Sequence, residues 1–436
     1  MMAQPVQSSA AACERTVLCE GVEARPFVDT AFLAGFFFSF RSIAVLVSAR
    51  WMNLGTEPGV IATFVAEFAL LLMIVFQSIG APERFAVSIT RPVRWVMFFL
   101  VFAGCSLAWS LTVSKLGSFL YWSGLVADFG IVMLLLRGRS TNSTVNSLFA
   151  GFIWSTCALA VIAWFIPATA DLRLGDTEYF NTNQIGNLAA LGIFLAQYLR
   201  RSNQGTRHQA RWICASIFLG ITLLRSLSKT TIIAFVCSQI VLLLLNRSMT
   251  RKQKLLTVTV LLAVVLSFWG LLTDYYDVYT TAGNQAETLT GRTAIWIYTF
   301  HAAIARPWLG NGFDSMWKVF PPFGGEFFEA RHAENELLQQ FFAYGVVGVV
   351  MLVGIYASLL RAIRGMRPDS GKAILGGMVL YVLIRGLAEA EPFDLLLPVW
   401  MVVVMAAISG QAQLITRSRE RTSVPTLAQA SAGMRA

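Results

Sequence analysis

Long apolar runs recur along almost the whole 436-residue chain and constrain its fold more than any other feature. Each run has roughly 17 to 25 residues, which is enough for a helix to cross a hydrocarbon core about 30 Å thick. A helix satisfies its own backbone hydrogen bonds inside a bilayer, so such runs predict membrane-spanning helices. We expect about twelve of them, over residues 30–48, 58–78, 93–110, 117–136, 146–166, 184–200, 211–226, 229–245, 255–273, 336–360, 373–389 and 395–410.

The balance of charged and apolar residues agrees with this fold class. Charged residues make up 13% of the chain and hydrophobic residues 56%, whereas soluble proteins carry about 25% charged residues. The predicted fold class is an all-α polytopic membrane protein in a lipid bilayer. Most of the 34 Lys and Arg residues fall on one side if both termini are cytoplasmic, as the positive-inside rule requires. The net charge of +10 is spread over many short loops, so we expect no nucleic-acid partner.

One long loop interrupts this series of spans on the outer face. It has about sixty residues, and loops longer than about 15 residues usually carry function. We therefore look for the chemistry there. The predicted division is an N-terminal cytoplasmic tail, nine spans, the outer catalytic loop, three spans and a C-terminal cytoplasmic tail, with boundaries at residues 1–29, 30–273, 274–335, 336–410 and 411–436.

Within this loop, TLTGRTAIWIYTFHAAIARPWLGNGF predicts a short helix. Thr290 can cap a helix that begins at Gly291, and Arg306-Pro307 ends it. Arg292 then lies in the first turn, where the helix dipole disfavours a cation. The same position suits an arginine that binds an anion together with the free N–H groups of that turn. The alternative is an exposed arginine that happens to start a helix.

The end of the loop, EARHAENELLQ, is rich in ionisable and amide side chains. We expect a helix that begins near Ala333, with Glu334 in its first turn. A histidine beside carboxylates suits general-base catalysis, and a polar stripe at the outer end of a membrane helix should face a wet cavity. The alternative is a solvated helix start. The predicted stripe, at i, i+3, i+4 and i+7, consists of His332, Asn335, Glu336 and Gln339.

Two further cations, Arg225 and Lys229, lie where LLRSLSKTTIIAF joins two spans with almost no loop. A charge at mid-bilayer costs about 2.5–3.5 kcal/mol on insertion scales, so each of them needs a partner. The alternative is that both side chains snorkel to the interface. Arg385 is satisfied if it pairs with Glu389 one turn on. Acids on other spans that could also pair with Arg225 and Lys229 are Glu67, Asp128 and Glu389.

These three stretches place cations and a candidate base on the outer side. Together they suit a diphosphate-bearing substrate and the deprotonation of an acceptor hydroxyl. Substitution at a sugar carbon with a diphosphate leaving group needs these parts, and stabilisation of the leaving group does much of the work. The three histidines show no paired-ligand spacing, so we expect neither a metal nor another cofactor.

The chain resembles the O-antigen ligase and polymerase superfamily (the WaaL/Wzy/ExoQ type). The resemblance covers roughly residues 180–365 and rests on SLSKT (226–230), GRTAIW (291–296), ARPWLGNGF (305–313) and RHAENELLQ…GVVG (331–348). It implies a GT-C-like membrane glycosyltransferase of about twelve helices, with short helices in its periplasmic loop. It also implies a bacterial inner-membrane location, both termini cytoplasmic, an undecaprenyl-diphosphate-linked glycan as donor, no metal, and inversion at the transferred sugar.

The resemblance assigns roles to particular residues. Arg292 would hold the diphosphate, Lys229 would replace the arginine of the family's Ser-Arg motif, and His332 would be the essential loop histidine. Many members have His-Ala-His-Asn where this chain has Glu334 in place of the second histidine, so the base is His332 or Glu334. Lysine in place of arginine weakens bidentate phosphate contact. Arg225 joins the predicted diphosphate-binding set, and the predicted supporting residues are Asn335, Glu336, Gln339, Arg306 and Arg331.

Three functions are compatible with these features. The first is polymerisation of a bacterial surface polysaccharide or exopolysaccharide, in which lipid-linked glycan passes to the next lipid-linked repeat unit; the Ser-Lys-Thr motif favours it. The second is ligation of the glycan to lipid A-core or to protein. The third is a transporter or flippase, against which the sequence shows no inverted repeats. Polysaccharide export and chain-length proteins are the expected protein partners.

Overall fold

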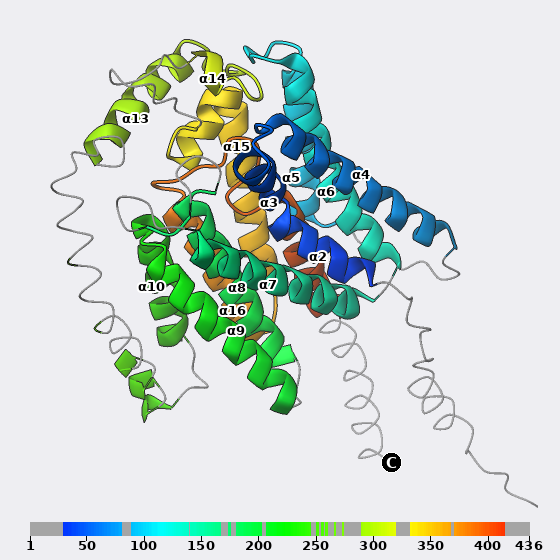
Figure 1. Cartoon of the computed structure of the whole chain (residues 1–436), viewed down its shortest axis with the longest axis vertical. Helices are drawn as coiled ribbons and strands as arrows, with labels where there is room; N and C mark the ends of the chain where they lie inside the picture. Colours follow the sequence, from blue (N-terminus) through cyan, green and yellow to red (C-terminus); the bar gives the residue numbers. More distant parts are fainter. Residues whose placement is uncertain are drawn as a thin grey trace, which may run out of the picture.

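The computed structural model describes residues 29–80, 89–138, 140–166, 173–175, 180–202, 206–245, 250–252, 254–256, 258, 259, 266, 273, 289–319, 332–367 and 370–414. These residues form helices joined by turns, with no strand among them, and Figure 1 shows their arrangement as one bundle. The helices are α2 (Thr30–Phe40), α3 (Ser42–Leu46), the π-helix η1 (Val47–Trp51), α4 (Glu57–Gly80), α5 (Arg91–Ser106), α6 (Lys115–Gly138), α7 (Thr141–Phe165), α8 (Thr182–Ser202), α9 (Thr206–Arg225), α10 (Lys229–Leu245), α13 (Leu289–Ile304), α14 (Met316–Val319), α15 (Glu336–Arg364), α16 (Ser370–Arg385) and a last helix, Val399–Leu414.

Four of the described helices, α4, α6, α7 and α15, are long and apolar enough to cross a membrane. A fifth span results if α2 and the α3–η1 segment, which are bent by 46° relative to each other, act as one. A described helix overlaps every predicted apolar run except 255–273, most of which lies outside the described residues. The prediction of a multi-pass helical membrane protein is confirmed, while the count of about twelve spans and the GT-C-like fold stay predictions.

The ends of α2 and α7 and their crossing follow directly from the sequence. Asp29 caps α2 through its side chain, and Ser140 caps α7 in the same way. The two helices pack closely because Gly35 and Gly151 lie at the crossing, where a Cβ on either would meet the backbone of the other helix. Small residues allow this close approach between helices in a membrane.

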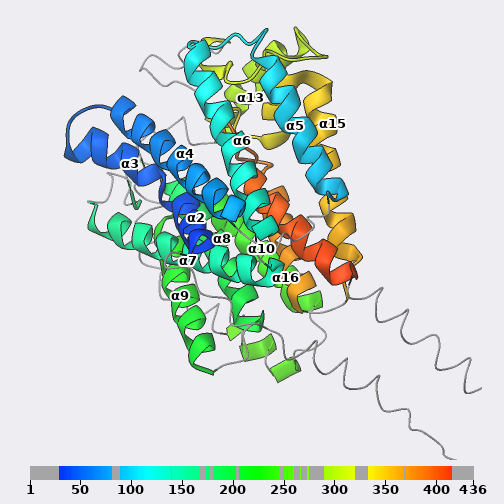
Figure 2. The ribbon, with the colours of Figure 1, turned by 90° about the vertical axis from the view of Figure 1, so that its right-hand side faces the viewer.

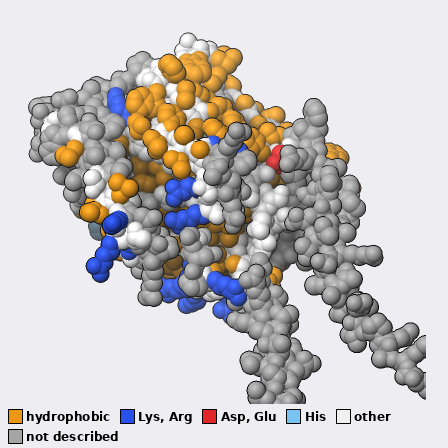
Figure 3. All heavy atoms as spheres, turned by 90° about the horizontal axis from the view of Figure 1, so that it is seen from below, with side chains coloured by type: hydrophobic (Ala, Val, Ile, Leu, Met, Phe, Trp, Pro, Cys, Tyr) orange, Lys and Arg blue, Asp and Glu red, His pale blue; other side chains and the backbone are white. Residues whose placement is uncertain are grey.

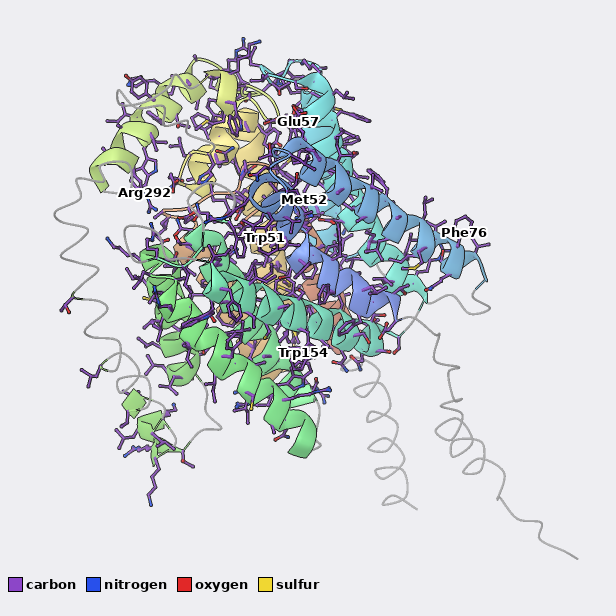
Figure 4. All side chains as sticks on the ribbon, viewed as in Figure 1. Trp51, Met52, Glu57, Phe76, Trp154 and Arg292 are labelled. Carbon is purple, nitrogen blue, oxygen red and sulfur yellow. The ribbon has the colours of Figure 1, made fainter. Side chains whose placement is uncertain are left out.

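The core of the bundle surrounds the last helix, Val399–Leu414, which is the orange-red helix beside α15 in Figure 2. Every residue from Val399 to Ala406 is buried, and Trp400 stacks on Phe38 of α2 and contacts Phe152 of α7. The outer helices instead expose large apolar side chains, as expected for lipid contact. Figure 4 shows Phe76 at the tip of α4, where it is 69% exposed.

The two ends of the bundle differ in charge. The last turns of α6, α8 and α15 are basic. Figure 3 shows Lys and Arg side chains on the face of the molecule seen from below. In the predicted orientation this face is the cytoplasmic one. The connections 107–114 and 305–315 lie at the opposite end and hydrogen bond to each other, as Leu111 N–H donates to the Asn311 carbonyl (3.0 Å).

A kink in α15 anchors the described part of the outer loop. Gly345 adopts a φ of +64° inside this helix, and its Cα lies against the backbone of Trp308. The segment after α13 runs along the kink, where Val346 N–H donates to the Pro307 carbonyl (2.8 Å) and Asn311 N–H to the Phe342 carbonyl (2.9 Å). The kink therefore frees backbone groups that fix the outer loop on the membrane helix. The parts of the loop at 274–288 and 320–331 lie outside the described residues.

Candidate functional site

The site is organised around the buried carboxylate of Glu389, in the connection that follows α16. Its Oε1 accepts hydrogen bonds from Asn183 Nδ2 at the start of α8 (2.7 Å) and from Thr230 Oγ1 at the start of α10 (3.5 Å). The same oxygen lies 3.4 Å from Nη2 of Arg292 in α13. Its Oε2 lies 3.6 Å from Nη2 of Arg385, the last residue of α16. One carboxylate thus joins four elements that are far apart in the sequence.

Arg292 is held between two carboxylates. It is the fourth residue of α13 and lies at the lower end of that helix in Figure 4. Its Nη2 lies 3.4 Å from Glu389 and 3.5 Å from Glu334 Oε2. Both contacts use Nη2, so the N–H groups of Nε and Nη1 are not used by these two carboxylates, and each can donate to an oxyanion. Its side chain is 15% exposed, so the charge is largely shielded from water.

His332 and Glu334 form the other half of the cluster. Nδ1 of His332 lies 3.7 Å from Glu334 Oε1 and accepts a hydrogen bond from the Glu334 backbone N–H (3.4 Å). Glu334 adopts a φ of +51°, which a non-glycine residue rarely does. Trp296 Nε1, one turn beyond Arg292, donates to the Glu334 carbonyl (3.2 Å). This strained backbone turns the Glu334 carboxylate toward both Arg292 and His332.

The expected helix start near Ala333 is wrong. Helix α15 begins at Glu336, and Asn335 is its N-cap, with Oδ1 accepting from Leu338 N–H (2.9 Å). Asn and Asp compete with helical hydrogen bonding and favour this position, which explains why the helix starts later than expected. His332 and Glu334 therefore lie before the helix, and the predicted helical stripe does not form.

Glu336 and Gln339 of the predicted stripe make hydrogen bonds inside the protein and stabilise the segment before α15. Glu336 is 5% exposed and accepts hydrogen bonds from the Tyr356 hydroxyl (2.8 Å) and from Leu396 N–H (2.9 Å). Gln339 Oε1 accepts from Ala333 N–H (2.8 Å). Both side chains are thus used inside the protein, where they hold the turn that carries His332.

Of the other predicted site residues, Lys229 adjoins a residue of this cluster, whereas Arg306 lies beyond the end of α13 that is opposite Arg292. Lys229 is the exposed first residue of α10, next to Thr230. Arg225 is the half-buried last residue of α9 and takes no part in the ion pairs of Arg292. Arg306 is exposed in the turn after α13. Arg331 lies outside the described residues.

Sequence reasoning missed the central position of Glu389. The sequence predicted the Arg385–Glu389 pair, and the structure confirms it. No local pattern indicated that Glu389 also contacts Arg292 and Asn183. The available signal was that the outer segment 167–183 is the second longest loop and ends in Asn-Thr-Asn, side chains that hydrogen bond well near helix starts. Glu391, 3.9 Å from Nη1 of Arg385, was also missed.

The fold and the site together define a multi-pass helical membrane protein with a charged cluster at one end of its bundle. Residues 214–353, about a third of the chain, match the family described as O-antigen ligase. This confirms the resemblance to the O-antigen ligase and polymerase superfamily and supports an enzyme of the ligase or polymerase type. The matched stretch includes Lys229, Arg292, His332 and Glu334. No curated protein matches the chain.

Proposed function

We propose that this protein is a metal-independent glycosyltransferase of the bacterial inner membrane, acting at the periplasmic face. It transfers undecaprenyl-diphosphate-linked glycan to the next lipid-linked repeat unit, and so polymerises a surface polysaccharide or exopolysaccharide. The observation that carries the proposal is the pairing of Arg292 with a histidine–carboxylate unit across 3.5 Å. This brings an anion-binding cation and a candidate base together at one end of the bundle.

In the proposed mechanism the diphosphate of the donor binds to the Arg292 guanidinium, with Lys229 and Arg225 as the further cations of the predicted set. The acceptor hydroxyl attacks the sugar carbon that carries the diphosphate, the bond from that carbon to the phosphate oxygen breaks, and the base takes the hydroxyl proton. Charge then grows on the leaving diphosphate, where a preorganised guanidinium is most effective. Attack from the side opposite the leaving group inverts the configuration.

We assign the base to His332 rather than to Glu334. The Glu334 carboxylate lies 3.5 Å from the Arg292 guanidinium, and a neighbouring cation makes a carboxylate a weaker base. A carboxylate beside a histidine has the opposite effect, because it stabilises the imidazolium that forms when the ring accepts a proton. Glu334 therefore acts as the link between the anion site and the base.

Ligation is the second candidate, and the O-antigen ligase description of the family at residues 214–353 favours it. It uses the same donor and the same residues but transfers the finished glycan to lipid A-core or to protein. Deleting the gene distinguishes the two. A polymerase mutant accumulates single lipid-linked repeat units, whereas a ligase mutant accumulates lipid-linked polymer that never reaches its acceptor.

Transfer by the purified protein tests the proposal as a whole. The full chain in detergent or nanodiscs is supplied with a lipid-linked donor and acceptor, and the products are separated by size. We expect longer lipid-linked glycan and release of undecaprenyl diphosphate. If the Arg292→Ala and His332→Ala variants both retained full transfer activity, the proposed site would be wrong.

A further inference from the structure

Asn183 is a half-buried asparagine at the start of α8 that uses both ends of its amide. Its Nδ2 donates to Glu389 Oε1 (2.7 Å). Its Oδ1 accepts from Ser228 Oγ (2.7 Å) and from Arg173 Nη2 (3.4 Å). A carboxylate only accepts hydrogen bonds and a guanidinium only donates them, so these partners fix which end of the amide is the donor. The side chain is thus held in one orientation between three other segments of the chain.

The oxygen end of this amide leads to Lys229. Ser228 is fully buried and directly precedes Lys229, the first residue of α10. The turn before it is strained, because Leu227 has a φ of +56°, which a leucine rarely adopts. Such a backbone persists only where the surrounding contacts hold it. The hydrogen bond from Ser228 to Asn183 is one of these contacts, and it helps to fix the point at which α10 begins.

The nitrogen end of the amide leads to Arg292. The Glu389 oxygen that accepts from Asn183 also lies 3.4 Å from Nη2 of Arg292. The same oxygen accepts from Thr230 Oγ1 (3.5 Å), on the other side of Lys229. The amide contact, at 2.7 Å, is the shortest of the three and therefore constrains this oxygen most. The position of the Arg292 guanidinium follows from that of the oxygen.

A neutral donor suits this place in the charged cluster. An amide holds the Glu389 carboxylate without cancelling the negative charge that Arg292 faces. Arg173, which is 6% exposed, lies behind the amide oxygen. Hydrogen bonds in a chain polarise one another, so Arg173 strengthens the donation from the amide to Glu389.

We propose that Asn183 is a positioning residue that sets the arrangement of Lys229 relative to Arg292. It acts through Ser228 on one side and Glu389 on the other, rather than by contact with the ligand. This inference rests on the proposed function, because it takes both cations as contacts of the donor diphosphate. It adds a residue from outside the stretch 214–353 that matches the family.

A double-mutant cycle tests the proposal, because it measures coupling separately from each single loss. Asn183→Ala and Lys229→Ala should each weaken binding of inorganic pyrophosphate about tenfold, the effect of one lost charge-assisted contact. In the Asn183→Ala background, Lys229→Ala should weaken it by less than about twofold, because Lys229 is already displaced. Arg292→Ala should show the same coupling to Asn183→Ala. Binding is measured by calorimetry on the full-length purified protein.

Asn187, one turn further along α8, provides the matched control. It is 7% exposed and accepts from the Tyr381 hydroxyl (2.8 Å). Asn187→Ala removes a hydrogen bond of similar length from the same helix, but this bond leads to α16 and not to either cation. The effects of Asn187→Ala and Lys229→Ala on pyrophosphate binding should therefore add.

Ser228→Ala keeps the test decisive if thermal unfolding shows that Asn183→Ala does not fold. It removes only the link to Lys229. Coupling to Lys229→Ala should persist in this variant, and coupling to Arg292→Ala should disappear.

The outcomes separate positioning from a purely structural role. If the effects of Asn183→Ala and Lys229→Ala add, Asn183 is a structural residue and the proposal is overturned. Absence of pyrophosphate binding to the wild type also overturns it. In the transfer assay, the KM for the lipid-linked donor should show the same coupling, and additive changes in KM would overturn the assignment to the donor site. If the wild type transfers no donor while the pyrophosphate cycle shows coupling, the proposed function fails and the positioning role stands.

Discussion

Two arginines of this protein each lie among two carboxylates, and they differ in how tightly they are held. Arg41, at the break between α2 and α3, donates from Nη1 to Asp128 of α6 at 2.8 Å, and Asp128 is 1% exposed. Glu67 of α4 points at Gly124, one turn before Asp128. Arg292 instead lies 3.4 Å and 3.5 Å from its two carboxylates. From the sequence, Asp128 was a candidate partner for Arg225 or Lys229. In the structure it pairs with Arg41 instead.

The difference indicates two uses of the same residue types. A short ion pair inside the bundle compensates a charge that the membrane would otherwise penalise, and it ties the broken first span to α6. Long contacts at the end of the bundle leave guanidinium donors available to a ligand. We therefore expect substitutions in the Arg41 cluster to change stability, and substitutions in the Arg292 cluster to change activity.

The largest expected effect is on activity at Arg292. Arg292→Ala should lower the rate of glycan transfer about a thousandfold, because a preorganised donor to a developing charge contributes about 4 kcal/mol. The measurement is transfer from the lipid-linked donor, with thermal unfolding in detergent recorded in parallel. Arg361→Ala, on an exposed arginine at the far end of α15, is the control and should transfer normally. If Arg292→Ala also lowered the unfolding temperature strongly, Arg292 would be a structural residue like Arg41, and the proposed difference between the two clusters would be wrong.

The second effect is on stability at Asp128. Asp128→Ala leaves the Arg41 guanidinium without its 2.8 Å partner and should lower the free energy of unfolding by about 3 kcal/mol. Thermal unfolding and size-exclusion chromatography measure this. The double variant Arg41→Met/Asp128→Leu should recover most of the loss, since apolar replacement of a buried pair is often neutral. If the single variant were as stable as the wild type but inactive, the Arg41 cluster would belong to the catalytic machinery.

The fold was more predictable than the site, for a physical reason. Apolar run length is a local property, so the sequence located almost every described helix. The residues around Glu389 come from α8, α10, α13 and α16, and no local pattern brings four such segments together. Arg292 and His332 were found because each has an unusual local position. Asn183 was not, because its role depends on a carboxylate 206 residues away in the chain.

A third prediction separates the two residues before α15. His332→Gln should lower transfer about a hundredfold, as expected for loss of a general base. Glu334→Gln should lower it about tenfold, because it removes one charge-assisted contact while the base remains. The rate of transfer at saturating donor is the measurement. The reverse order of effects would assign the base to Glu334 instead.

The smallest expected effect is at Asn335, which lies next to the proposed catalytic pair in sequence but caps helix α15. Its Oδ1 caps α15 (2.9 Å from Leu338 N) and its Nδ2 donates to the Leu387 carbonyl (3.0 Å). Asn335→Ala should lower the free energy of unfolding by about 1 kcal/mol, the usual cost of a lost N-cap. Asn335→Asp keeps the cap and should recover most of that stability, since an acid suits the start of a helix. Transfer should fall less in both variants than in Glu334→Gln. A loss of transfer in Asn335→Asp comparable to that in His332→Gln would show that Asn335 contacts the substrate and belongs with His332 and Glu334.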